Sequence, residues 1–216
     1  MSEWSAIELK AGQHASPADG LCLMEAVALF AGERHGDWPY CVCPALIEFG
    51  RVLNDALPDR RRTAMLLPLV PVLVGTREPG CTGDGLNPSP LGRQRAAALV
   101  AWCVNTLPNK PAVPDGEEGQ RRAASLEEAQ DALRFGQAQH AARAAAAAVA
   151  WAAKGAWHRS LGEALIRPVS PRQAAEEASH AALAVWQEAI NAYRDAALLG
   201  RPAMAPLIPA VERIDG

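Results

Sequence analysis

Residues 22–44, CLMEAVALFAGERHGDWPYCVCP, hold three of the chain's five cysteines beside a histidine and several acidic side chains. Thiolates and imidazole nitrogens are ligands that zinc prefers, and ligands that lie close in sequence lose little loop entropy when a site forms. The segment therefore contains candidates for a structural zinc site, completed by one of two histidines: Cys22, Cys41, Cys43, and His14 or His35.

Two other interpretations of these cysteines stay open. The C-x-C spacing of Cys41 and Cys43 is less diagnostic of zinc than paired C-x-x-C motifs, so the thiols could be buried or incidental. Cys43 also precedes Pro44 at an expected helix start, where the helix dipole favours a reactive thiolate. Elsewhere we expect Cys81 to be exposed in a loop and Cys103 to lie in the core.

Glu25 is the only charged residue in the apolar stretch between Leu21 and Gly32. A carboxylate buried in such a stretch must be paired, hydrogen-bonded or protonated. In one interpretation it anchors a loop by accepting hydrogen bonds from backbone amides or from an arginine such as Arg34 or Arg51. In the other it is an acid/base or metal-associated group that faces two further side chains, Asp37 and His35.

Two other polar positions have an ordinary structural interpretation. Asp37 lies in GDWP, where an aspartate typically bonds to its own turn, although it is also a candidate partner of Glu25. Asn54 and Asp55 fall near an expected helix end, where asparagine is a common cap. A functional carboxylate pair at either position is the less expected alternative.

The elements that position these side chains are predicted to be helices. Gly32 ends the first, Pro44 suits the first position of the second, and Asp59 is the expected N-cap of the third, which should bend at Pro68 or Pro71. These helices are expected over residues 21–31, 44–57 and 59–74.

The second half of the chain is richer in alanine and has clearer helix starts. Residues 125–128, SLEE, form a capping-box sequence. Ser170-Pro171 also predicts a helix start, with serine as the N-cap and proline in the first helical turn. Gly- and Pro-rich residues 76–90 predict a loop, and 108–120 resemble a linker. The expected helices are 91–107, 125–153 and 170–200.

No stretch has the period-two alternation of a strand, so the predicted fold class is all-α. We expect a helical bundle or stacked helical hairpins, with long Ala-rich helices in the C-terminal half, forming one compact unit or two closely packed subdomains. The expected divisions are a helical motif region, a Gly/Pro loop, an Ala-rich helical region and an extended tail: 1–76, 77–90, 91–200 and 201–216.

Composition excludes several classes of function. The net charge of −3 provides no basic footprint for nucleic acid, and we expect the densest basic run, 60–62, to form a solvated helix face rather than an anion or partner contact. The start of the chain has acids and no apolar signal region, and no apolar run is long enough to span a bilayer. We therefore expect a cytoplasmic protein with reduced thiols and no membrane association.

An ordered string of short motifs resembles a family of uncharacterised bacterial and phage proteins over roughly residues 10–76. The residues that carry it are His14, 20–27, 31–33, Asp37, Pro39, Cys41, Pro44, Asn54-Asp55 and 73–76. This resemblance implies no activity. The second half, including HAARAAAAAVAWAA, is loosely similar in composition to helical immunity-type proteins, which implies a helical stack that binds a partner.

The function expected from these features is that of a non-catalytic protein-interaction or regulatory factor. It would be a phage, prophage or mobile-element accessory protein of the immunity or anti-defence type, able to bind a protein partner and to form homo-oligomers. The alternative is a small metal-dependent enzyme that uses Glu25 with Asp37 and His35, or His14, beside a cysteine-bound zinc. No nucleotide-binding or hydrolase motif supports other routes to catalysis.

Overall fold

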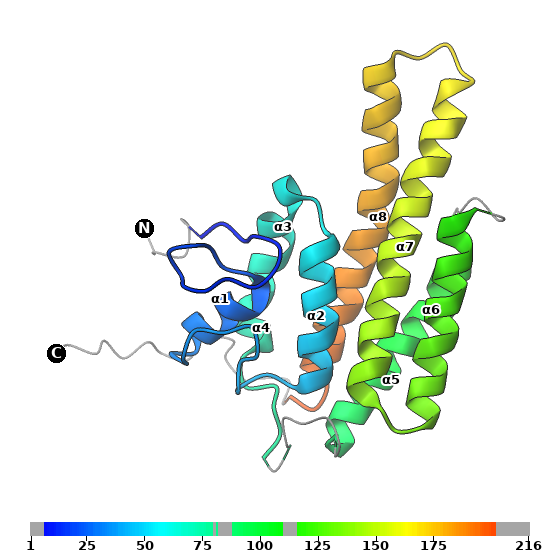
Figure 1. Cartoon of the computed structure of the whole chain (residues 1–216). Helices are drawn as coiled ribbons and strands as arrows, with labels where there is room; N and C mark the ends of the chain where they lie inside the picture. The colour runs from blue at the N-terminus through cyan, green and yellow to red at the C-terminus, as the bar shows by residue number, and fades with distance from the viewer. Residues whose placement is uncertain (1–6, 80, 82–87, 110–115, 202–216) are drawn as a thin grey trace.

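The computed structural model describes residues 7–79, 81, 88–109 and 116–201 (Figure 1). Over these residues the chain is helical and has no strand, apart from an isolated bridge between Leu9 and Leu21. This confirms the all-α prediction. The helices are α1 (Leu23–Phe30), α2 (Pro44–Ala56), α3 (Asp59–Leu66), α4 (Val70–Leu73), α5 (Pro90–Thr106), α6 (Glu117–Arg134), α7 (Ala138–Leu165) and α8 (Pro171–Leu198).

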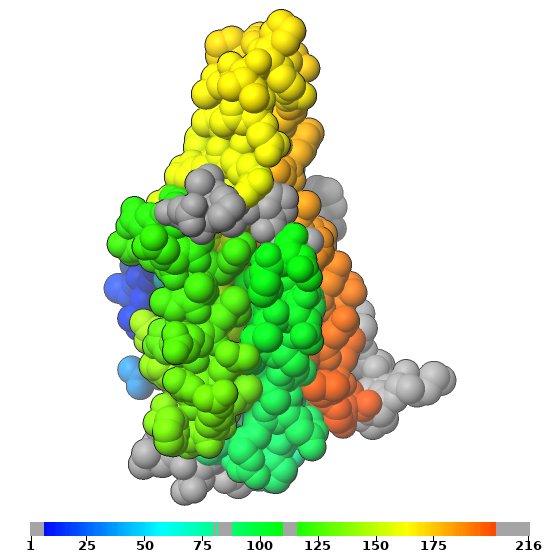
Figure 2. Space-filling model, turned by 90° about the vertical axis from the view of Figure 1, so that its right-hand side faces the viewer, coloured from blue at the N-terminus to red at the C-terminus, as the bar shows by residue number. Residues whose placement is uncertain are grey.

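Helix α7 is the centre of the bundle and packs against α2, α5, α6 and α8. Its buried positions are all alanine except Val149 and Gly155. Small side chains let neighbouring helix axes approach closely, so the Ala-rich sequence suits a helix surrounded by others. The predicted long Ala-rich helices of the C-terminal half are thus present, and α7 and α8 extend as a hairpin beyond the other helices (Figures 1 and 2).

Helix starts were predicted well where a proline lies in the first helical turn. Pro44 is the first residue of α2, and Pro171 is the first residue of α8. The Ser170 hydroxyl accepts a hydrogen bond from the backbone N–H of Gln173 at 3.2 Å, and thereby satisfies one of the orphan amides of the first turn.

The predicted start at Ser125 is wrong, because Ser125 lies inside α6. Helix α6 begins eight residues earlier, at Glu117, within the stretch that resembled a linker, and ends at a Schellman motif. There Gly136 adopts φ +71°, its N–H donates to the Leu133 carbonyl, and Gln137 N–H donates to that of Ala132. The chain can therefore turn from α6 into α7 where one continuous helix was expected.

Three smaller predictions in the first half also change. Pro58 rather than Asp59 is the N-cap of α3. The bend expected at Pro68 or Pro71 is present as a short 3₁₀ turn, Leu67–Leu69, which contains Pro68 and separates α3 from α4. Cys81 is buried and not exposed, whereas Cys103 lies in the core as predicted. Arg62 is buried too, so the basic run is not entirely a solvated face.

One hydrophobic core runs from Leu9 to Ala197 and includes side chains from both halves of the chain. The part of the predicted extended tail at 202–216 lies outside the described residues. None of the described helices combines the length and the apolarity needed to cross a bilayer.

Candidate functional site

The candidate site is built on the first turn of α1. Cys22 is the N-cap residue, with an extended backbone at φ −80° and ψ 174°. The Cys22 sulfur accepts a hydrogen bond from Glu25 N–H at 3.5 Å, and the Glu25 carboxylate accepts one from Cys22 N–H at 2.7 Å. This reciprocal arrangement is a capping box, in which a cysteine takes the place usually held by serine or threonine.

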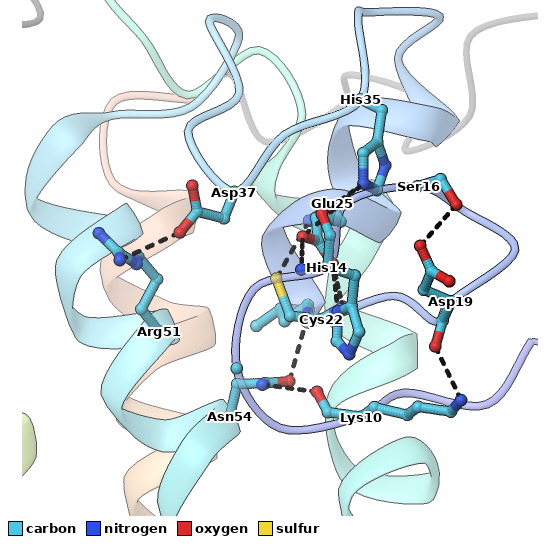
Figure 3. Close-up of polar contacts among 12 residues, drawn as sticks. Lys10, His14, Ser16, Asp19, Cys22, Glu25, His35, Asp37, Arg51 and Asn54 are labelled. Carbon is cyan, nitrogen blue, oxygen red and sulfur yellow. Dashed lines mark hydrogen bonds and ion pairs between the residues drawn. The ribbon is translucent and has the colours of Figure 1, made fainter.

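Glu25 also closes the preceding loop onto α1 (Figure 3). Its side chain is fully buried, and it accepts hydrogen bonds from the backbone N–H of His14 at 2.7 Å and from His14 Nδ1 at 2.8 Å. The carboxylate thus has three donors, two of which are backbone amides. This is the loop-anchoring arrangement expected from the sequence, made with amides and not with Arg34 or Arg51.

His35 is near this centre without bonding to the carboxylate. Its Nε2–H donates to the His14 carbonyl at 3.0 Å and lies 3.9 Å from Glu25 Oε1. The second histidine therefore holds the same loop through its backbone. The structure brings together four of the predicted residues: Glu25, His14, His35 and Cys22.

The electrostatics of the site favour a charged Glu25. Burial acts to raise the pKa of this carboxyl, but hydrogen bonds from the Cys22 and His14 amides and from the His14 ring outweigh burial, so the pKa is lowered. A carboxylate whose pKa is lowered is a weak base and is seldom protonated near neutral pH. The arrangement is therefore better suited to holding backbone groups than to transferring protons.

Asp37 is not a partner of Glu25. Its carboxylate points toward Arg51 of α2, and Asp37 Oδ2 lies 3.0 Å from Arg51 Nη2 (Figure 3). The Arg51 guanidinium also lies 5.9 Å from the centroid of the Trp38 ring. Asp37 thus ties the loop after α1 to α2, so the expected grouping of Glu25 with Asp37 is not present.

Asn54 joins the site to α2 and is not the helix cap that its position suggested. Its Oδ1 accepts a hydrogen bond from Leu23 N–H at 3.1 Å, and its Nδ2 donates to the Lys10 carbonyl at 2.9 Å. The side chain is buried. One amide therefore satisfies both the first turn of α1 and the segment that leads into the His14 loop.

Burial disfavours the thiolate form at two cysteines of the segment, Cys22 and Cys41. Burial raises the pKa of Cys22 to about 12, and burial together with nearby Glu33 raises the pKa of Cys41 to about 12. Cys43 is buried at the N-cap of α2, and its backbone N–H donates to Thr76 Oγ1 at 3.0 Å. A zinc ligand or nucleophile needs the thiolate, which this environment disfavours at Cys22 and Cys41.

Within the described part of the chain, no three His, Cys, Asp or Glu side chains are grouped so that they could hold a metal ion. The proposed zinc ligands Cys22, Cys41, Cys43 and His14 are all among these residues. The zinc hypothesis therefore gains no support from their placement.

Sequence reasoning missed two buried arginines that bind carbonyl groups at helix ends. Arg95 of α5 donates to the carbonyls of Thr76, Ala196 and Leu199, with distances of 3.2 Å to Ala196 and 2.8 Å to Leu199. It thus neutralises the C-terminal end of α8, where the helix dipole favours a cation. Nothing in the local sequence signals this role, because α8 and α5 are far apart in the chain.

Arg62 has the same role at the end of α2. Its guanidinium donates to the carbonyl of Asn54 at 2.6 Å and to that of Leu57 at 2.7 Å, while also pairing with Asp59 at 2.7 Å. These carbonyls cannot be satisfied inside α2 because the helix stops there. Arg62 follows the end of α2 closely in the sequence, so this short separation could have indicated that its side chain caps the helix.

Comparisons with known proteins do not assign this geometry to a family. No family model matches the chain, and searches of curated proteins and of solved structures found no significant match.

Proposed function

We propose that this protein is a non-catalytic interaction or regulatory factor that binds a protein partner through the projecting α7–α8 hairpin. The observation that carries the proposal is the end of this hairpin, which reaches beyond the other helices (Figures 1 and 2). Its tip presents Leu165, with 66% of its surface exposed, and Ile166, with 87% exposed. Adjacent large apolar side chains on a projecting arm favour contact with another molecule.

Backbone hydrogen bonds and ion pairs along the α7–α8 hairpin favour a rigid structure. The α7 and α8 backbones satisfy their own hydrogen bonds, and Arg167 forms an ion pair with Glu177 across the turn. Arg172 and Glu176 pair at 3.0 Å one helical turn apart. Charged residues that surround an apolar tip resemble the polar rim of a protein interface.

The alternative enzyme has less support from the same structure. Glu25 is sealed from solvent and engaged by two backbone amides, while Asp37 is engaged by Arg51. Both groups would have to break these contacts before they could act on a substrate. We therefore favour the structural interpretation of residues 22–44.

The biological setting is proposed on the sequence alone. The motif string over residues 10–76 supports an accessory protein of a phage, prophage or mobile element, of the immunity or anti-defence type. The composition supports action in the cytoplasm. Under this proposal the N-terminal region is a scaffold and the Ala-rich hairpin is the partner-binding element.

The test compares partner capture by three forms of the tagged protein. Proteins are captured from a lysate of the source cells with each of three forms. These are the wild type, a tip variant with Leu165→Ser and Ile166→Ser, and a control with Phe135→Ser. Phe135 is 77% exposed but lies at the α6–α7 turn, so it controls for loss of surface apolar area. Quantitative mass spectrometry then measures which proteins each form retains.

We expect at least one protein to be retained equally by the wild type and by Phe135→Ser. The amount of this protein captured by the tip variant should be roughly tenfold lower, because the substitutions remove apolar anchor side chains from the interface. The purified partner should then bind the purified wild type with the same preference. Equal binding of that partner to the tip variant, or capture that never depends on the tip, would contradict the proposal.

A further inference from the structure

A cavity of about 400 Å³ lies at the base of the α7–α8 hairpin, beside the corner at which α2 passes into α3. Its volume falls in the range of sites that bind small molecules. The described side chains that line it are four alanines, one proline, three tryptophans and one lysine. None of these residues belongs to the site around Glu25, so the cavity is a separate feature of the molecule.

The tryptophans give the cavity broad aromatic walls. Trp151 and Trp157 come from α7 and Trp186 from α8. Trp186 is buried, whereas Trp151 and Trp157 are half-buried and keep part of their ring surface open. Aromatic rings gain contact energy from other rings that stack on them or meet them edge to face. The alanines between them leave room for a flat ring, so these walls suit an aromatic ligand.

The polar groups of the described lining side chains are all hydrogen-bond donors. The Lys154 ammonium has three N–H donors and no acceptor, and each tryptophan has one indole N–H and no acceptor. The alanine and proline side chains have no polar group. A ligand group that pairs with these side chains must therefore be an acceptor, and a carboxylate also complements the charge of Lys154.

Lys154 joins this cavity to α6, which contributes none of the described lining. Its Nζ lies 3.4 Å from Glu118 Oε1 of α6 and 5.2 Å from the centroid of the Trp151 ring. Glu118 has a second partner in His158, whose Nδ1 lies 3.0 Å from the same oxygen, so the carboxylate stays engaged when Lys154 turns toward a ligand. The guanidinium of Arg121 lies 4.7 Å from the centroid of the Trp151 ring. Two cations thus border this wall, and a cationic ligand would be repelled.

We propose that this cavity binds a small planar aromatic carboxylate. The aromatic ring packs against Trp157 and Trp186, and the carboxylate pairs with the Lys154 ammonium. This inference goes beyond the proposed function, because the binding surface proposed above is the tip of the hairpin and this cavity lies at its base. A neutral ring could use the aromatic walls but would leave Lys154 without an anionic ligand group.

A comparison of three ligands with the same ring tests the proposal on the wild-type chain. The probes are naphthoate, the neutral naphthyl methanol and the cationic naphthyl methylamine. Each is titrated into protein labelled with fluorotryptophan, and fluorine NMR follows the tryptophan signals, which single Trp→Phe variants assign. Naphthoate should shift the signals of the cavity residues Trp151, Trp157 and Trp186. The signals of Trp38 and Trp102, which do not line the cavity, should stay in place.

The charge of the carboxylate should decide the affinity. We expect naphthoate to bind at least roughly tenfold more tightly than the alcohol or the amine, because only the carboxylate forms a charge-assisted hydrogen bond with Lys154. Lys154→Met should lower the affinity for naphthoate to that for the alcohol and leave the affinity for the alcohol unchanged. The matched control is Arg143→Met, which removes a positive charge from an exposed position of α7 outside the lining and should leave both affinities unchanged.

The walls are tested separately with Trp157→Ala, which should weaken the binding of naphthoate and of the alcohol alike. Circular dichroism and thermal melting establish that each variant folds. The comparison of the three ligands on the wild type needs no substitution, so it decides the proposal even where a variant does not fold.

Four results would overturn the proposal. Equal affinities for the acid and the alcohol would show that Lys154 takes no part, and tighter binding of the amine would make the cavity a cation site. Shifts of Trp38 or Trp102 in place of the cavity tryptophans would locate binding elsewhere. The fourth is the absence of any saturable shift at millimolar naphthoate, which would show that the cavity does not take this class of ligand.

Discussion

In the N-terminal region, residues 9–76, short helices are joined by irregular segments, whereas α7 and α8 run uninterrupted for 28 residues each. Irregular segments leave backbone N–H and C=O groups that must find partners when they are buried. In the N-terminal region polar side chains supply these partners, and the buried ones are Glu25, Asn54, Arg62 and Thr76.

The α7–α8 hairpin needs no such side chains along its length. Each turn satisfies the backbone of the next, and the positions buried in α7 are nearly all alanine. Its polar side chains are free to form the outer surface. Among those of α8 the exception is Tyr193, whose buried hydroxyl donates to the Leu46 carbonyl of α2 at 2.7 Å.

This contrast explains why residues 22–44 look like a catalytic site in the sequence. Carboxylates, histidines and amides are the side chains that catalysis uses, but they are also the side chains that replace missing helix hydrogen bonds. Glu25 and His14 meet at the point where a loop enters a helix. When such residues cluster beside helix ends, the backbone N–H and C=O groups that they bind show whether their role is structural.

The largest effect expected from this contrast is that of Glu25→Ala. The change leaves the amides of Cys22 and His14 and the His14 ring without their acceptor in a buried place. We expect the free energy of unfolding to fall by about 3–5 kcal/mol, as when one member of a buried charged network is removed. Urea denaturation followed by circular dichroism measures the loss.

The matched control for this change is Glu163→Ala in the projecting part of α7. Glu163 is exposed and lies 4.0 Å from Arg159, so its removal should change the free energy of unfolding by less than about 0.5 kcal/mol. Equal effects of the two substitutions would show that Glu25 does not anchor the N-terminal loop.

An intermediate effect is expected from Arg62→Met. Methionine preserves much of the buried aliphatic volume but leaves the carbonyls of Asn54 and Leu57 without their donor. The expected loss in the free energy of unfolding is about 2 kcal/mol. The neighbouring exposed residue gives the control, Arg61→Met, which should cost less than about 0.5 kcal/mol. If both variants unfold at the same urea concentration, the capping role of Arg62 is wrong.

The smallest effect is expected from pH. Because hydrogen bonds lower the pKa of Glu25 in the folded state, its contribution to stability is complete above its unfolded value, near 4.5, and is lost as pH falls through the folded value. The difference in free energy of unfolding between wild type and Glu25→Gln should therefore shrink as pH is lowered from 6 toward 3. Urea titrations of both proteins over this range measure it, and a difference that stays constant would contradict an ionised Glu25.

Much of the helical framework could be predicted from local sequence. Pro44 and Ser170-Pro171 marked the starts of α2 and α8, and Gly32 marked the end of α1. These signals work because a cap or a proline acts on its own few residues. The break at Gly136 was missed because Ala-rich sequence on both sides favours helix, and only the left-handed turn separates α6 from α7.

The burial of Glu25 was also predictable, since it is a lone charge in an apolar stretch, and so was the need for partners. Which partners it has could not be predicted. Arg34, Arg51, His35 and backbone amides were all close enough in sequence, and the choice depended on how the loop before α1 folds back. Arg51 turned out to face Asp37.

The sequence by itself therefore determined the all-α class, most helix starts and the requirement that Glu25 be satisfied, because these follow from short-range hydrogen bonding and hydrophobic pattern. Only the tertiary structure decided that His14 and Glu25 meet, that Arg95 holds the end of α8, and that the α7–α8 hairpin projects. Such contacts join residues distant in the chain, and their geometry is set by how whole helices pack.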